Sequence, residues 1–256
     1  THPPPPEIYT LTRSSAASDV YKRQVQKLSY RLDVADYQRV DVAVCPPFTA
    51  LRSAQTVIET DHLQIGLGAQ NVFWEESGAY TGEIAPPMLA ALSVSYVIIG
   101  HSERRELFGE TNEDTNRKVK AVLAAGMTPI LCCGETEEER EAGVTEDKVG
   151  SQVRAGLAGL TPEQIAAMVV AYEPIWAIGT GRTASDDDAG AMASFVRATI
   201  ADIAGDASES TRILYGGSMN PGNVAGLMAK KDIDGGLVGG ASLDPDTFAS
   251  VVRYWV

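Results

Sequence analysis

The sequence has few basic residues for the number of acidic ones. Lysine and arginine together number 21, against 34 aspartate and glutamate residues, so the formal net charge is −13 over 256 residues. Nucleic acids and anionic membrane surfaces are bound through a basic face, and this charge balance argues against both as partners. No apolar run reaches the roughly 18 residues of a membrane-spanning helix, and no signal-peptide pattern comes before the globular part. We therefore expect a cytoplasmic protein.

Cysteine and histidine are scarce as well. Cys45, Cys132 and Cys133 are odd in number and lack the spacing of metal ligands, so reduced thiols are the simplest interpretation. The three histidines do not form a metal-ligand cluster in the sequence. Neither GxGxxG nor GxxxxGK[ST] occurs. We expect neither a metal nor a cofactor.

What the sequence does contain is a regular alternation of two patterns. From Val40 onward, apolar runs of strand length alternate with amphipathic stretches of helix length, which predicts repeated βα units around a parallel sheet. Seven strands are predicted, at residues 40–45, 63–69, 96–100, 127–132, 168–172, 212–215 and 236–238. A closed barrel needs an eighth, and only residues 7–12 could supply it as the first strand. The prediction is a single-domain α/β fold, a (β/α)8 barrel over residues 25–256.

The clearest helices are predicted at residues 112–125, 137–157, 187–203 and 244–254, with the first helix running from near Val20 past Leu28. Asp244 followed by Pro245 is typical of an N-cap and the first helical position. Residues 1–24 are different, because Pro3 to Pro6 lack amide donors and the remainder shows weak periodicity. We predict that these residues form a separate amino-terminal segment.

Two polar side chains follow directly on apolar strands, where parallel barrels build their active sites. His101 comes after the strand that ends near Gly100, and Glu173 comes after the strand that ends at Tyr172. A glutamate that leaves a hydrophobic strand toward a closable pocket gains proton affinity by desolvation, as a general base for carbon acids requires. Residues 174–181 contain Trp176 between a proline and glycines, which predicts a lid. The alternatives are a structural histidine and a solvated glutamate beside a packing tryptophan.

Two glycine-rich turns follow the last two predicted strands. Gly216-Gly217-Ser218 is one, and Gly239-Gly240 is the other. Barrels often bind phosphate after these strands, and glycine lets the backbone amides approach the anion closely. Together the turns favour a phosphate site.

The segments GHSERR (100–105), YEPIWAIGTG (172–181), YGGS (215–218) and VGGASL (238–243) are similar to signature segments of the triosephosphate isomerase family. CPPFTAL, AQNVFWEESGAYTGEIAP and CCGET also resemble that family, so the resemblance runs from about Val25 to the end. It implies a TIM barrel that interconverts dihydroxyacetone phosphate and glyceraldehyde 3-phosphate through an enediolate, in glycolysis and gluconeogenesis. It further implies that the enzyme uses no cofactor or metal.

The resemblance also implies roles for particular residues. Glu173 would shuttle the proton, neutral His101 would polarise the carbonyl oxygen, and Glu103 would assist beside them. The phosphate would be held by Gly179, Ser218, Gly239 and Gly240. The loop from Glu75 to Gly82 would reach into a partner subunit, where Thr81 would complete the neighbouring site, so a homodimer is expected. The alternative for this loop is a mobile surface segment.

One family feature is missing. Members of the family carry an Asn-x-Lys motif on their first strand, and the lysine contacts the substrate phosphate, but the motif is absent here. Lys22 and Lys27 fall in the first predicted helix and do not match it. We hypothesise that residues 1–24 replace the natural amino terminus. The chain is then an isomerase or, alternatively, a catalytically impaired phosphate-binding barrel; a different phosphate-handling enzyme would not require both His101 and Glu173.

Overall fold

The computed structural model describes residues 18–178 and 183–256. The strand predicted at residues 7–12 lies outside the described residues, as does Gly179, which is predicted to bind phosphate. The polyproline run and the second half of the predicted lid lie outside them too.

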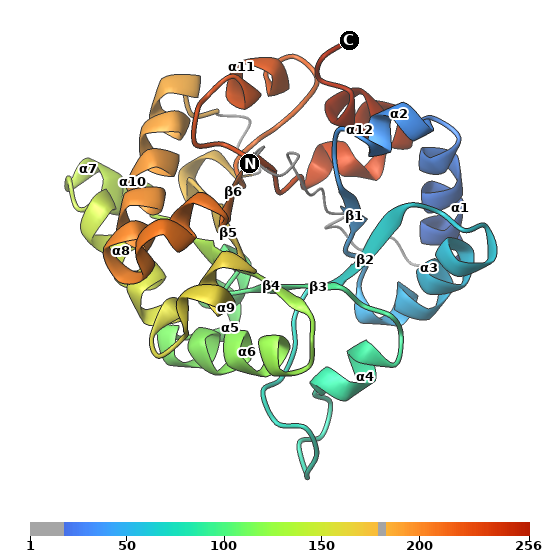
Figure 1. The fold of residues 1–256 in the computed structure, drawn as a ribbon, viewed down its shortest axis with the longest axis horizontal. Coiled ribbons are helices and arrows are strands. Elements are labelled where there is room, and N and C mark those ends of the chain that lie inside the picture. The colour runs from blue at the N-terminus through green and yellow to red at the C-terminus, as the bar shows by residue number, and fades with distance from the viewer. Residues whose placement is uncertain (1–17, 179–182) are drawn as a thin grey trace.

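Within the described part of the chain, the strands form one parallel sheet whose order follows the sequence. Figure 1 shows the sheet curving around a centre, with the helices on its outer side. The strands are β1 (Val42–Val44), β2 (Ile65–Ala69), β3 (Tyr96–Ile99), β4 (Thr128–Cys133), β5 (Val169–Tyr172), β6 (Arg212–Tyr215) and β7 (Gly235–Gly236). All seven predicted strands are confirmed. β6 has the predicted bounds, and the ends of the others lie within two residues of the prediction.

The helices follow the strands as the pattern predicts. They are α1 (Ser18–Ser29), α2 (Val34–Tyr37), α3 (Phe48–Thr60), α4 (Pro86–Ala90), α5 (Ser102–Phe108), α6 (Asn112–Ala124), α7 (Glu137–Glu141), α8 (Thr145–Leu157), α9 (Pro162–Ala166), α10 (Asp186–Ala204), α11 (Val224–Met228) and α12 (Pro245–Val252), with short 3₁₀ turns η1 (Ile175–Ala177), η2 (Gly205–Glu209) and η3 (Gly240–Leu243). Asp244 caps α12 by accepting the amide of Thr247, as predicted. None of these helices is long and apolar enough to cross a membrane.

One predicted helix is wrong as a single element. Residues 137–157 form α7 and α8, separated by a turn at Gly143. Gly143 has a φ of 72°, which is the left-handed region that glycine enters without a steric penalty. Residues 137–141 are all charged and none is buried, so the apolar periodicity belongs to α8 alone and did not locate the break.

The core has two layers because neighbouring strand residues point to opposite faces of the sheet. Ala43, Cys45 and Cys132 belong to the apolar cluster inside the barrel. Val44 and Cys133 belong to the larger cluster between the sheet and the helices. Burial of each large aliphatic side chain in these layers contributes roughly 1.5–3 kcal/mol. This packing holds the carboxyl ends of the strands in place, and the candidate site is built there.

Candidate active site

The carboxyl ends of the strands surround a pocket of about 450 Å³. The described residues on its wall include six that the sequence predicts as site residues: His101, Glu103, Glu173, Ser218, Gly239 and Gly240. These residues follow β3, β5, β6 and β7. The fold therefore brings together residues as distant in sequence as His101 and Gly240, which are 139 positions apart. The walls also include Ile178, Met219 and Leu237, which give the pocket an apolar side.

Glu173 is a buried carboxylate, with 2% of its side chain exposed. Its Oε2 atom accepts the backbone N–H of Ser102 at 2.9 Å, which is an amide in the first turn of α5. Its Oε1 atom lies 3.0 Å from Nε2 of His101. Apart from this contact, Oε1 has no hydrogen-bond partner among the described residues. The carboxylate is thus held by one backbone amide and faces the His101 imidazole.

His101 immediately precedes α5 and caps it. Its Nδ1 atom accepts the backbone N–H of Glu103 at 3.3 Å, so in the neutral imidazole the proton is on Nε2, which faces Glu173. The Glu103 side chain itself is 66% exposed, and its carboxylate lies 3.9 Å from Nδ1. Glu103 therefore contacts His101 chiefly through its backbone amide.

Opposing influences act on the His101 imidazole. Burial lowers its pKa, whereas the negative charge and contact of Glu173, followed by the charges of Glu103 and Glu110, raise it; the result is a pKa raised from 6.5 to about 9. The hydrogen bond from the Glu103 amide to Nδ1 works against this rise, because it requires an unprotonated Nδ1. With the pocket free of ligand, the protonation of His101 thus depends mainly on Glu173.

The two glycine turns also line the pocket, and their glycines carry no side-chain atoms. A methyl group built on Gly240 would meet no atom within 4 Å, so this backbone borders open space. The Gly239 carbonyl is held by the Ser242 hydroxyl at 2.6 Å and by the Ser242 amide at 3.0 Å. The turn is therefore open to the pocket, and Ser242 holds its backbone in place. That is the environment in which backbone amides can meet an anion.

Gly216 has a role that the sequence did not reveal. A Cβ atom built on Gly216 would lie 2.8 Å from Cγ of Glu173 and 3.2 Å from the Tyr172 carbonyl oxygen, so the absence of a side chain makes room for the carboxylate. The sequence pattern suggested only close approach to a ligand for this glycine. The backbone amide of Ser102 was likewise missed, because no sequence signal marks an amide that holds a carboxylate.

Replacing Gly216 by alanine is expected to displace the Glu173 side chain and lower turnover. A shift of about 1 Å in a reacting group costs up to about 10²-fold in rate, so kcat should fall by about 10- to 100-fold with a smaller change in KM. The measurement is steady-state kinetics of the isomerisation that the sequence resemblance implies. Gly190→Ala is the control, because the nearest atoms there belong to the flexible Lys230 side chain. A wild-type kcat for Gly216→Ala would contradict the spacing argument.

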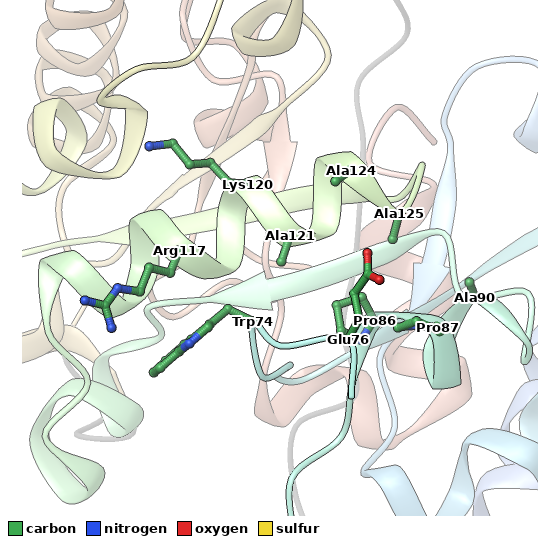
Figure 2. A pocket seen from close by; sticks show the side chains of 10 residues that line it. All are labelled: Trp74, Glu76, Pro86, Pro87, Ala90, Arg117, Lys120, Ala121, Ala124 and Ala125. Atoms are coloured by element: carbon green, nitrogen blue, oxygen red, sulfur yellow. The ribbon is translucent and has the colours of Figure 1, made fainter. Parts of the chain in front are cut away.

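Another cavity of the described part of the molecule lies elsewhere. It measures about 660 Å³ and lies outside the barrel mouth, between α4, α6 and the segment from Trp74 to Glu76 (Figure 2). Its walls are mainly proline and alanine, with Arg117 stacked on the Trp74 ring at 5.3 Å. It contains no pair of a base and a hydrogen-bond donor comparable to Glu173 and His101. Chemistry therefore places the active site in the smaller pocket.

Comparison with known proteins shows the family of the chain. The family model described as Triosephosphate isomerase matches residues 16–255. The chain belongs to the triosephosphate isomerase family. It is 53% identical over 220 residues to a triosephosphate isomerase of Lactobacillus delbrueckii subsp. bulgaricus, which covers 86% of each chain. It is 53% identical to one from Endomicrobium trichonymphae, covering 86% of this chain and 88% of the relative, and 52% identical to one from Clostridium perfringens, covering 84% and 87%.

Membership of the triosephosphate isomerase family confirms the resemblance that the sequence motifs carried, and it confirms the α/β barrel class. The family match starts at residue 16, and α1 runs from Ser18 across residue 24 to Ser29 without a break. The division of the chain at residues 24 and 25 stays a prediction. In the described part, no group of three or more histidine, cysteine, aspartate or glutamate residues is arranged to hold a metal ion.

Proposed function

We propose that this chain interconverts dihydroxyacetone phosphate and D-glyceraldehyde 3-phosphate, with Glu173 as the proton-transferring base and His101 as the hydrogen-bond donor to the carbonyl oxygen. The observation that carries the proposal is the 3.0 Å approach of Glu173 Oε1 to His101 Nε2 on the wall of a pocket that also contains the two glycine turns. The reaction belongs to glycolysis and gluconeogenesis, and we place it in the cytoplasm. All three cysteines are buried and unpaired, as is usual in a reducing compartment.

The chemistry needs one proton to move between adjacent carbons and one to move between the oxygens that these carbons carry. Glu173 takes the proton from the carbon next to the carbonyl, the electron pair forms the carbon–carbon double bond of an enediolate, and negative charge develops on the former carbonyl oxygen. The Nε2–H group of His101 donates to that oxygen and stabilises it. Glu173 then returns the proton to the neighbouring carbon, while the hydroxyl proton of the first carbon passes to the former carbonyl oxygen, beside which His101 Nε2 lies in this proposal. The two sugar phosphates have the same atoms, so no further reactant is required.

Substrate entry also explains how a neutral imidazole could serve this step. If the substrate carbonyl oxygen lies between His101 Nε2 and Glu173, the neighbour of Nε2 becomes a neutral acceptor in place of a carboxylate. The largest influence that raises the pKa of His101 would weaken, while burial, which lowers it, would remain. Residues 174–181 are proposed to close over the pocket and exclude water. Ile178, the last described residue before the gap, already lines the pocket and supports this assignment.

Phosphate binding is assigned to the backbone amides and hydroxyl of Ser218, Gly239 and Gly240, with Gly179 predicted to contribute an amide. A second candidate function has a specific observation in its favour. The described residues that line the pocket include no lysine or arginine. The absence of a cationic side chain among these described residues, opposite a dianionic substrate, favours the alternative of a catalytically impaired phosphate-binding barrel.

One assay distinguishes the two candidates. Turnover of glyceraldehyde 3-phosphate is measured in a coupled assay, and binding of inorganic phosphate is measured by calorimetry on the same preparation. Turnover together with phosphate binding supports the isomerase. Phosphate binding with no turnover supports the impaired barrel. A protein that neither turns over the substrate nor binds phosphate would contradict both candidates.

We also propose a homodimer, in which the loop from Glu75 to Gly82 enters a pocket of the partner. Figure 1 shows this segment projecting beyond α4, away from the barrel. Phe73, just before the loop, packs against Tyr80 with ring centroids 4.7 Å apart, and the amide of Glu83, just after it, donates to the Tyr80 carbonyl. These contacts hold the shape of the loop. Thr81 is exposed.

The receiving site is a pocket of about 310 Å³ beside the active site, which shares His101 and Glu103 with it. Phe108 lines this pocket with 68% of its surface exposed, and Leu107 next to it is 69% exposed. Two large apolar side chains in contact with water at a pocket rim are typical of a protein interface. A partner loop there would lie against the helix that carries His101, so dimerisation and activity would be linked.

Replacing Phe108 by glutamate is expected to produce monomers with strongly reduced turnover. The charge would have to be buried without a partner, which costs several kcal/mol. Size-exclusion chromatography with light scattering gives the mass, and turnover is assayed on the same fractions. Val34→Glu changes a valine that is 66% exposed on α2 and serves as the control. A Phe108→Glu variant that stays dimeric would contradict the proposed interface.

A further inference from the structure

The first described helix contacts the turn that is proposed to bind phosphate. Gln24 on α1 donates a hydrogen bond from Nε2 to the carbonyl oxygen of Leu243 at 2.6 Å. Leu243 is the last residue of η3, the short turn that begins at Gly240. The two partners are 219 residues apart, so this contact depends entirely on the tertiary structure.

A short chain of contacts leads from Gln24 to the pocket. Leu243 follows Ser242, which is 1% exposed, and Ser242 holds the Gly239 carbonyl through both its hydroxyl and its amide. Gly239 and Gly240 then line the pocket. The last carbonyls of a short helical turn have no partner within the turn, so a donor from outside fixes the direction in which the turn points. Gln24 supplies that donor.

The surroundings of Gln24 show that this contact is not a chance meeting of surface groups. Gln24 lies between Tyr21 and Val25 on one side and Leu28 on the other, and these three side chains are 1%, 1% and 2% exposed. A small gap of about 10 Å³ separates Gln24 and Val25 from Ser242, Pro245 and Phe248. The Oε1 atom of Gln24 is buried and has no hydrogen-bond partner among the described residues, so the orientation of the side-chain amide is determined by the bond to Leu243. Gln24 is thus a polar side chain in an apolar contact, where it makes this one hydrogen bond.

We infer that Gln24 is a positioning residue for phosphate binding, which sets the placement of the Gly239 and Gly240 amides through η3. The inference rests on the proposed function, in which these amides hold the substrate phosphate. It assigns a role in the site to a residue within the segment 1–24, for which the sequence predicted none.

The test compares Gln24→Met with a matched variant on the same helix. Methionine has a similar length and retains the apolar packing, but it cannot donate to Leu243. Lys27→Met removes an exposed ion pair between α1 and Asp246 of α12, at 2.8 Å, and so weakens the same helix contact without touching η3. The readouts are KM and kcat for glyceraldehyde 3-phosphate, the dissociation constant of inorganic phosphate from calorimetry, and the melting temperature.

For Gln24→Met we expect KM and the phosphate dissociation constant to rise by about 2- to 10-fold, the ratio that corresponds to one net hydrogen bond. We expect kcat to change less, and Lys27→Met to leave both constants near the wild-type values. Equal constants for the two variants would overturn the inference, because a merely structural contact would then explain both. Should Gln24→Met fail to fold, Gln24→Glu, which also lacks the donor, is measured in the same way and judged by the same outcomes.

The calorimetric readout separates this inference from the proposed function. A wild-type protein without isomerase activity would contradict the proposed function. Phosphate binding that still weakens in Gln24→Met would nevertheless support the role of Gln24. Phosphate binding that is normal in Gln24→Met would reject that role, whatever the turnover of the wild type.

Discussion

Replacing Glu173 by glutamine lowers kcat by about 10²- to 10⁴-fold, the range by which a positioned general base accelerates proton transfer. Glutamine has the same shape and can still accept the Ser102 amide through its carbonyl oxygen, so the loop after β5 should keep its conformation. The amide cannot take a proton from carbon at neutral pH. The loss should therefore appear in kcat, measured with saturating glyceraldehyde 3-phosphate, with little change in KM.

The control is a second buried carboxylate far from the pocket. Asp232 is 8% exposed and accepts hydrogen bonds from Arg197 and Ser194. Asp232→Asn should lower the melting temperature without a matching loss of kcat. Glu173→Gln with more than a tenth of the wild-type kcat would show that another group removes the proton.

Replacing His101 by asparagine is expected to lower kcat by about 10²- to 10³-fold, as the loss of one donor to a developing oxyanion does. The asparagine Oδ1 atom can take the place of Nδ1 and accept the Glu103 amide, so the cap of α5 is preserved. What disappears is Nε2, the atom that faces Glu173 and, in the proposed reaction, the substrate oxygen. The effect should therefore be catalytic and not structural.

Circular dichroism and the melting temperature establish whether the His101→Asn variant keeps its fold. His62→Asn is the control, because His62 is exposed and has a φ of 51°, which asparagine tolerates. A His101→Asn variant with wild-type kcat would remove His101 from the mechanism. A variant that loses both its fold and its activity would point to a structural histidine, which is the alternative that the sequence left open.

The pH dependence of the same pair gives an independent check. The pKa of His101 is raised above the ordinary 6.5 to about 9, so its contact with Glu173 stabilises the fold fully below about pH 6.5. That contribution is lost as the pH rises through about 9. An NMR titration of the imidazole should show the raised pKa in the wild type. It should show a lower one in Glu173→Gln, because burial remains while the neighbouring charge is gone; an unchanged pKa would mean that Glu173 does not control His101.

Most of the strand layout could be predicted, because periodicity and strand-end punctuation are local properties. β6 was located at its observed bounds, and His101 and Glu173 were identified because each directly follows an apolar run. The single helix predicted over residues 137–157 failed for the opposite reason. Residues 137–141 are all charged, so no apolar spacing was available to mark the break, and the turn depends on the left-handed backbone at Gly143.

Other features of the site depend on pairs of distant residues. The Ser102 amide meets Glu173 across 71 residues, and Gly216 leaves space for the same side chain. An amide has no sequence signature, and the absence of a Cβ atom has a meaning only once its neighbour is known. Gln24 belongs to the same class, since nothing in its local sequence indicates the Leu243 carbonyl.

The sequence by itself determined the kind of protein: the alternation of patterns specified a parallel βα barrel, and the strand-end residues with their motifs specified the family. The tertiary structure alone decided how the groups act. Whether Glu173 keeps a free oxygen, how strongly His101 holds its proton, and which helix braces the phosphate turn all depend on burial, charge and distance between segments far apart in the chain. Local patterns depend on residues that are neighbours in sequence, whereas electrostatic and steric environments exist only after the chain has folded.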